Sequence, residues 1–119
     1  MYLINVGING EESREAFRRE VEQVLGTIEG INPDAAVLWT SLHALPVEIS
    51  YIVTDRVDPR NVVLNALASE GRLTLLPWAE VATANPQIYL EDGVHYFGNE
   101  QLFVTTLVSG LDAWIASQP

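Results

Sequence analysis

The chain has 119 residues, 48% of them hydrophobic, and a formal net charge of −10 at pH 7. This length and hydrophobic content predict a single domain over residues 1–119, with one core. An acidic surface repels phosphate backbones and anionic lipids, so we expect no nucleic-acid partner. The absence of Cys excludes disulfides and thiolate metal sites. Neither an apolar stretch of about 20 residues nor a signal-peptide pattern is present, so we expect no membrane insertion by this segment and assign no compartment.

The first half of the chain predicts a strand, a helix and a second strand. Tyr2–Val6 is an apolar run closed by Gly7, which suits a strand buried on both faces. The next segment, capped by Ser13 and ending near 26–30, is an amphipathic helix. Its apolar residues recur at helical spacing: Phe17, Val21, Val24, Leu25 and Ile28. The second strand contains Val37-Leu38-Trp39.

The second half predicts a helix, a third strand and a final helix. Residues 48–57 are ambiguous between strand and loop, and we interpret them as a loop. Asp58-Pro59 begins a helix, with Asp as cap and Pro at the first helical position, and Gly71 stops it. The third strand is Leu73–Leu76, and a loop is predicted from about residue 79 to 97. The last helix covers about 99–116.

Strands that alternate with helices indicate an α/β class with a three-stranded parallel sheet. In such sheets the reactive positions lie beyond the carboxyl ends of the strands. Three loops qualify: 7–10, 41–46 and 77–95.

The third loop ends in Asp92-Gly93-Val94-His95, directly before the final helix. An Asp three residues before a His, on a turn opened by Gly, can fold its carboxylate back to the imidazole. The carboxylate then accepts the Nδ1 hydrogen and leaves Nε2 free as a general base. Taken alone, the same residues also fit a simple turn followed by an ordinary loop histidine. A metal site at this pair would need a third ligand that the sequence does not show, so we expect no metal.

The position of this motif resembles the last motif of the SGNH (GDSL-like) hydrolase superfamily. The first segment is similar to the strand of that family that ends in Gly-x-Asn, here Gly7-Ile8-Asn9. The following elements have the family's order, and the run from Leu76-Pro77-Trp78 to Asp92 is like the SGNH domain attached to membrane O-acyltransferases that act on cell-envelope sugars. The resemblance covers nearly the whole chain.

The resemblance implies a three-layer α/β/α (flavodoxin-like) fold and a Ser-His-Asp mechanism without a cofactor. His95 would be the general base, Asp92 its orienting carboxylate, and Asn9 an oxyanion-hole donor. The substrate would be an acyl or acetyl ester, on a small molecule or a carbohydrate. Asn9 by itself would fit a polar turn residue equally well.

This chain departs from the family at its beginning. The family's first two strands, with the Gly-Asp-Ser that supplies the nucleophile, have no counterpart here, and Gly10 stands where the family usually has Asp. None of the six serines is a clear substitute. Ser41 is the candidate at the end of a strand, but it is not on the sharp strand–turn–helix that exposes a nucleophile, and His43 beside it reads as a loop histidine.

The sequence therefore predicts an SGNH-type esterase or acyltransferase domain that is N-terminally incomplete relative to the family and inactive alone. The alternative is a non-catalytic SGNH-like binding or assembly module. Without the first two strands, Tyr2–Val6 becomes an exposed apolar edge, which predicts self-association or pairing with a complementary N-terminal segment.

Overall fold

The computed structural model describes residues 1–8, 13–47 and 57–119. The elements in chain order are β1 (Tyr2–Ile4), α1 (Arg14–Ile31), β2 (Val37–Thr40), α2 (Val57–Ser69), β3 (Thr74–Leu76), α3 (Trp78–Ala84), the short 3-10 helix η2 (Pro86–Ile88) and α4 (Glu100–Ser117). No helix in these ranges is long and apolar enough to cross a bilayer.

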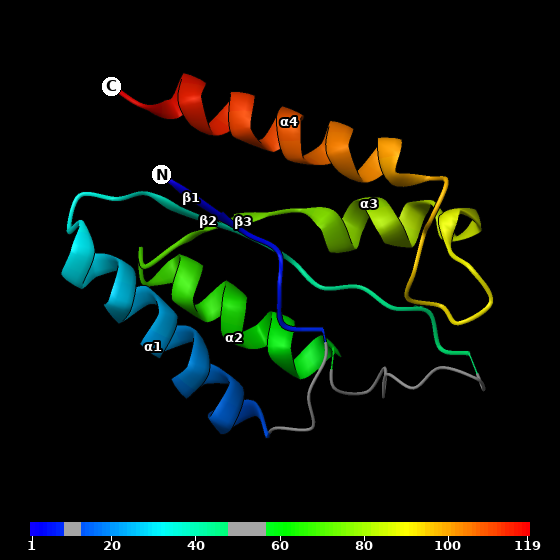
Figure 1. Cartoon of the computed structure of the whole chain (residues 1–119), viewed down its shortest axis with the longest axis horizontal. Helices are drawn as coiled ribbons and strands as arrows, with labels where there is room; N and C mark the ends of the chain where they lie inside the picture. Colours follow the sequence, from blue (N-terminus) through cyan, green and yellow to red (C-terminus); the bar gives the residue numbers. More distant parts are fainter. Residues whose placement is uncertain (9–12, 48–56) are drawn as a thin grey trace.

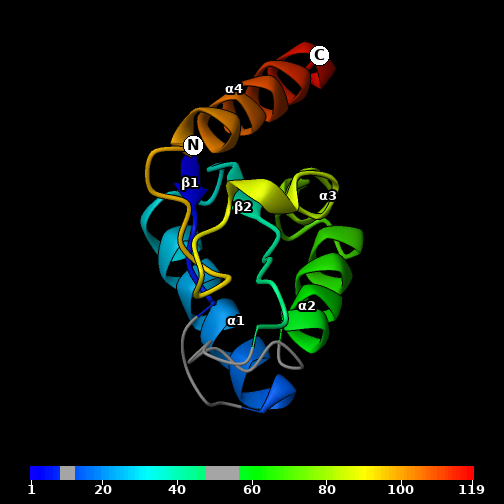
Figure 2. The ribbon, with the colours of Figure 1, turned by 90° about the vertical axis from the view of Figure 1, so that its right-hand side faces the viewer.

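The three strands form one parallel sheet in the order β1-β2-β3. Helices α1 and α2 lie on one side of this sheet and α4 lies on the other (Figure 1). The view turned by 90° shows the same layers, with α4 above the sheet and α1 and α2 below it (Figure 2). The predicted α/β class with three parallel strands is confirmed.

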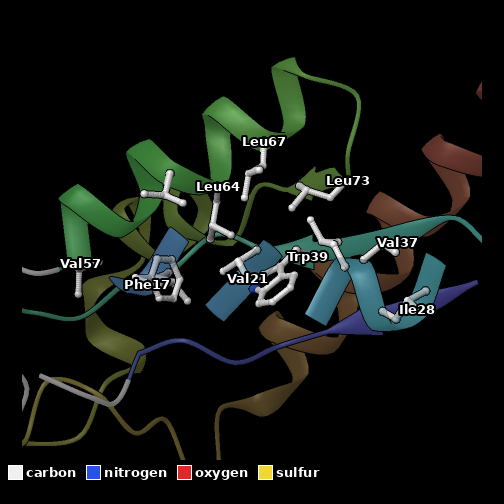
Figure 3. Packing of buried hydrophobic residues seen from close by; sticks show 12 residues of the cluster. Phe17, Val21, Ile28, Val37, Trp39, Val57, Leu64, Leu67 and Leu73 are labelled. Atoms are coloured by element: carbon white, nitrogen blue, oxygen red, sulfur yellow. The ribbon is translucent and has the colours of Figure 1, made fainter. Parts of the chain in front are cut away.

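The main core lies between the sheet and the helices α1 and α2 (Figure 3). The predicted helical stripe of α1 faces inward: Phe17, Val21, Leu25 and Ile28 are all buried. Strand β2 is buried along its whole length, as a central strand of a parallel sheet should be. The predicted cap also forms, because the Ser13 side chain accepts a hydrogen bond from Ala16 N at 3.2 Å.

A second cluster lies between α3, η2 and α4. Its buried members are Trp78, Ala82 and Ile88, and Tyr96 and Phe103 pack against them. The prediction of a continuous loop over 79–97 is therefore wrong, since α3 and η2 fall within it. Trp78, Val81 and Ala82 do have helical spacing, but α3 has only seven residues and no capping side chain, so its pattern is too short to stand out in the sequence.

Strand β1 differs from the prediction of burial on both faces. Tyr2 and Leu3 are exposed, Leu3 to 49%, because β1 pairs with β2 alone and its other edge has no neighbouring strand in the described parts of the chain. The boundaries also shift by a few residues: α1 continues to Ile31 and α2 already begins at Val57. The predicted loop over 48–57 lies almost entirely outside the described residues.

Candidate active site

The three loops at the carboxyl ends of the strands meet around one pocket of about 270 Å³. The loop after β1 contributes Asn5, Val6 and Ile8, and the loop after β2 contributes Ser41, Leu42 and His43. The third side comes from Trp78 and from the segment that leads into α4: Val94, His95, Tyr96, Phe97 and Glu100. The candidate base His95 thus lies at the edge predicted for reactive groups.

His95 and Asp92 are in direct contact. Nδ1 of His95 lies 2.6 Å from Oδ2 of Asp92, while Oδ1 of Asp92 accepts hydrogen bonds from the backbone N–H groups of Val94 and His95, each at 2.9 Å. Because a carboxylate only accepts, Nδ1 carries the hydrogen in this contact. In the neutral imidazole this contact leaves Nε2 as the nitrogen that can receive a proton.

Gly93 allows this tight turn. Its φ is +71°, in the left-handed region that favours glycine, and a Cβ there would lie 2.8 Å from the backbone oxygen of Leu45. The Gly93 carbonyl in turn accepts a hydrogen bond from Leu45 N at 2.7 Å. The third loop is therefore held against the second one, and a larger residue at Gly93 would push the two apart.

The contact also determines the charge of Asp92. The hydrogen bond from the His95 side chain, with the backbone N–H groups of His95 and Val94 behind it, lowers the pKa of the Asp92 carboxyl to about 2. The carboxylate is therefore ionised at all physiological pH values. It orients the imidazole and would stabilise the imidazolium that forms when His95 takes up a proton.

The loop after β1 is anchored from α2. Arg60 is almost fully buried, and its Nη1 donates to the carbonyl oxygens of Gly7 and Ile8 at 2.8 and 3.0 Å. Its guanidinium also lies 5.3 Å from the centre of the Phe17 ring. The candidate oxyanion donor Asn9 comes next in the chain and lies outside the described residues, as does Gly10.

Ser41 has a structural position. It is buried, its Oγ donates to the Leu76 carbonyl at 3.1 Å, and the same Oγ accepts from Ala79 N at 2.7 Å. Both functions of the hydroxyl are thus used to join the end of β2 to the start of α3. Of the other described serines, Ser13 caps α1, Ser69 and Ser117 donate to carbonyls within their own helices, and Ser109 lies on α4.

Asn5 was not singled out by the sequence and His43 was assigned no contact there, yet both line the pocket. Asn5 lies at the end of β1 and its Oδ1 accepts from the Thr40 hydroxyl at 2.7 Å. His43 lies with Nδ1 2.8 Å from the Tyr89 hydroxyl, and burial lowers its pKa, against a smaller opposing effect of Asp58. Asn5 directly follows β1 and is a polar residue in an otherwise mostly apolar run, which is a signal that sequence reasoning could have used.

Aromatic residues close the pocket on the α4 side. Tyr96 lies 5.4 Å from Trp78 and 5.6 Å from Phe103 between ring centres, so it belongs to the second cluster. Phe97 is directed elsewhere: its ring stacks on the His95 imidazole, with the centres 5.2 Å apart and the planes at 15°. Sequence reasoning missed both, because neighbouring aromatics in a predicted loop have no periodic pattern.

Among the residues described, no group of three or more His, Asp or Glu side chains is arranged to hold a metal ion. The contact between His95 and Asp92 is an arrangement that can transfer a proton, and it lies next to a pocket with both apolar and polar lining residues.

No family model and no curated protein matches the sequence. The structure is similar to that of a protein described as a GDSL-like lipase from Parabacteroides merdae, with a TM-score of 0.71 and 13% identity over 91% of this chain. It is also similar to the esterase domain of the ORF1 protein of the zebrafish ZfL2-1 retrotransposon, with a TM-score of 0.65 and 15% identity over 87% of this chain. The matched regions span 59% and 62% of those two chains. The fold of this chain is therefore part of a GDSL-like (SGNH) α/β fold.

Proposed function

We propose that this chain supplies the acid–base part of an SGNH-type serine ester hydrolase or O-acyltransferase. The observation that carries the proposal is the His95–Asp92 pair, joined at 2.6 Å beside a pocket at the carboxyl ends of the parallel strands. The partial GDSL-like fold supports it, because ligands of open α/β sheets bind beyond the carboxyl ends of the strands, where His95 lines the pocket. The choice of acetyl or related acyl esters of a carbohydrate rests on the resemblance of the run from Leu76 to Asp92.

In the proposed reaction a serine hydroxyl attacks the ester carbonyl while Nε2 of His95 takes the hydroxyl proton. Asp92 keeps the imidazolium oriented, and Asn9 donates a hydrogen bond to the oxyanion of the tetrahedral intermediate. His95 then gives the proton to the departing alcohol, which leaves an acyl-serine. Water or an acceptor hydroxyl, deprotonated by His95, attacks this ester and regenerates the serine.

The serine in this mechanism comes from outside residues 1–119. Among the described serines, Ser41 is the one that lines the pocket, and both of its hydrogen-bonding functions are already used. We propose that a serine-bearing strand of the same fold pairs with the free edge of β1, where Leu3 and Val6 are exposed. A strand added there ends at the same edge of the sheet as His95, so its final turn can carry the nucleophile to Nε2.

The second candidate function is a non-catalytic SGNH-like binding or assembly module. The buried, fully bonded hydroxyl of Ser41 favours it, since this serine at the pocket cannot act as the nucleophile without giving up those bonds. In that reading the pocket binds a ligand and His95 serves as a polar contact.

One experiment distinguishes the enzymatic proposal from the non-catalytic module. The codons upstream of Met1 are read in frame, and the resulting longer product is expressed. We expect a Gly-Asp-Ser after an apolar run, and hydrolysis of p-nitrophenyl acetate that falls by about 100- to 10,000-fold in His95→Ala. Asp112→Asn, a change at an exposed position of α4, is the control and should leave turnover unchanged. A stop codon close upstream would favour the non-catalytic module, and turnover that survives His95→Ala would overturn the enzymatic proposal.

A further inference from the structure

Phe97 occupies an unusual position for a large apolar residue. It is 68% exposed and is not part of either buried cluster, whereas Tyr96 before it packs against the second one. Burial therefore contributes little to its placement. Its ring instead lies nearly parallel to the His95 imidazole, at 15° and 5.2 Å between centres.

The backbone fixes Phe97 independently of that stack. Asn99 N donates to the Tyr96 carbonyl at 2.8 Å, which makes Phe97 and Gly98 the two central residues of a turn. Gly98 has φ +86°, as the third residue of a type II turn requires. The Asn99 side chain donates to the Ile88 carbonyl at 3.0 Å and ties this turn to η2. Phe97 is thus presented to His95 by a braced turn.

We propose that Phe97 is a positioning residue for His95, whose ring holds the imidazole against Asp92 and directs Nε2 toward the pocket. This inference rests on the proposed role of His95 as the general base. It assigns to Phe97 no contact with the reacting atoms.

The His95 ring needs a second restraint because its surroundings provide few. Its side chain is 56% exposed, and one hydrogen bond at Nδ1 still allows the ring to tilt about that contact. An offset aromatic stack restrains the tilt, and such stacks are favourable. When His95 takes up a proton, the resulting cation lies over the face of the Phe97 ring, which is an attractive arrangement. The same contact therefore supports both the resting geometry and the protonated form.

The pKa of the Asp92 carboxyl is the quantity that tests the role of Phe97. This pKa is about 2, and the hydrogen bond from the His95 side chain is the largest cause. If Phe97 holds the imidazole in place, Phe97→Leu weakens that hydrogen bond and raises the pKa of Asp92 by roughly half a unit. The measurement is a carbon-13 NMR titration of the Asp92 carboxyl in the 119-residue chain.

Two further variants provide reference values for the pKa of Asp92. Phe97→Tyr retains an aromatic ring and should leave the Asp92 titration as in the unaltered chain. His95→Ala removes the hydrogen bond and should raise the pKa of Asp92 further than Phe97→Leu does. Circular dichroism of each variant checks the fold, which an exposed residue outside both clusters should not disturb. An Asp92 titration that is the same in Phe97→Leu and in the unaltered chain would overturn the inference, and so would the lack of ring-to-ring nuclear Overhauser effects between His95 and Phe97.

This experiment needs neither a serine nor a substrate. A longer product without esterase activity would therefore leave the outcome at Phe97 intact. Conversely, a fully active longer product together with a pKa of Asp92 that Phe97→Leu leaves unchanged would support the proposed function and reject this inference.

Discussion

At the scale of single residues, Asp92 uses both of its oxygens, and each has a different task. Oδ1 accepts from two backbone N–H groups and fixes the carboxylate within its own turn, while Oδ2 faces Nδ1 of His95. The turn therefore orients the carboxylate, and the carboxylate orients the imidazole. Four consecutive residues can in this way hold an oriented imidazole on an otherwise exposed loop.

The low pKa of Asp92 predicts how stability depends on pH. A carboxyl whose pKa is lowered by folding, here to about 2, contributes stability above its ordinary pKa and loses it as the pH falls toward 2. We expect the melting temperature of the unaltered chain to exceed that of Asp92→Asn at pH 6, and this difference to shrink between about pH 4 and pH 2. Thermal unfolding followed at several pH values checks it. A difference that stays constant over this range would contradict the expectation, and Asp112→Asn serves as the control.

Ser41 yields a prediction about stability. Ser41→Ala leaves Ala79 N without the hydroxyl that accepts from it, and removes the Oγ donor to the Leu76 carbonyl. We expect the free energy of unfolding in urea to fall by about 1–3 kcal/mol. Ser109→Ala, at an exposed position of α4, should change it by less than about 0.5 kcal/mol. Equal stability of Ser41→Ala and the unaltered chain would show that these bonds are unimportant.

At the scale of elements, Arg60 joins three parts of the fold. It lies in the first turn of α2, donates to the Gly7 and Ile8 carbonyls after β1, and approaches the Phe17 ring on α1. Arg60→Met should lower the free energy of unfolding by about 1.5–3 kcal/mol, because two partly buried carbonyls lose a charged donor. Arg72→Met removes a partly exposed ion pair with Glu29, whose atoms are 3.8 Å apart, and should cost less than about 1 kcal/mol. Similar losses in both variants, measured in urea, would argue against an anchoring role of Arg60.

The sequence correctly predicts those elements that have a long pattern of apolar residues or a capping residue at an end. The stripe of α1, the cap at Ser13 and the apolar run around Trp39 are such signals, and the structure confirms each of them. Helix α3 is not predicted because seven residues are too few to show a helical repeat of apolar residues, and because no side chain caps the helix. Burial of β1 was wrong because burial depends on neighbouring strands, which the segment's own residues do not specify.

The site could be predicted only in part. Asp92 and His95 are close in sequence, so local turn geometry is enough to bring them together, and the structure shows that contact. The remaining pocket residues come from three loops and meet only through the fold. His43 and Tyr89 are 46 positions apart, and nothing local to either indicates the other. The role of Asn9 stays a prediction.

At the scale of the whole molecule, the outer edge of β1 is one of the two unpaired edges of the described sheet, the other being that of β3. The exposed Leu3 of β1 and the parallel pairing with β2 provide a template for another strand. We expect the 119-residue chain to self-associate at tens of micromolar in sedimentation velocity, and Leu3→Lys to shift it toward monomer. Val62→Lys, at an exposed position of α2, should not. A monomer for the unaltered chain would count strongly against this role of the edge.

The claim that the chain holds a base without its nucleophile is tested most directly by labelling with a fluorophosphonate and locating the adduct by mass spectrometry. We predict no labelled serine in the 119-residue chain. In a longer product that includes the proposed strand, we predict labelling of a serine outside residues 1–119, at a rate that falls by about 100- to 10,000-fold in His95→Ala. Labelling of any of the six serines of the 119-residue chain, or a labelling rate in the longer product that is independent of His95, would contradict the account.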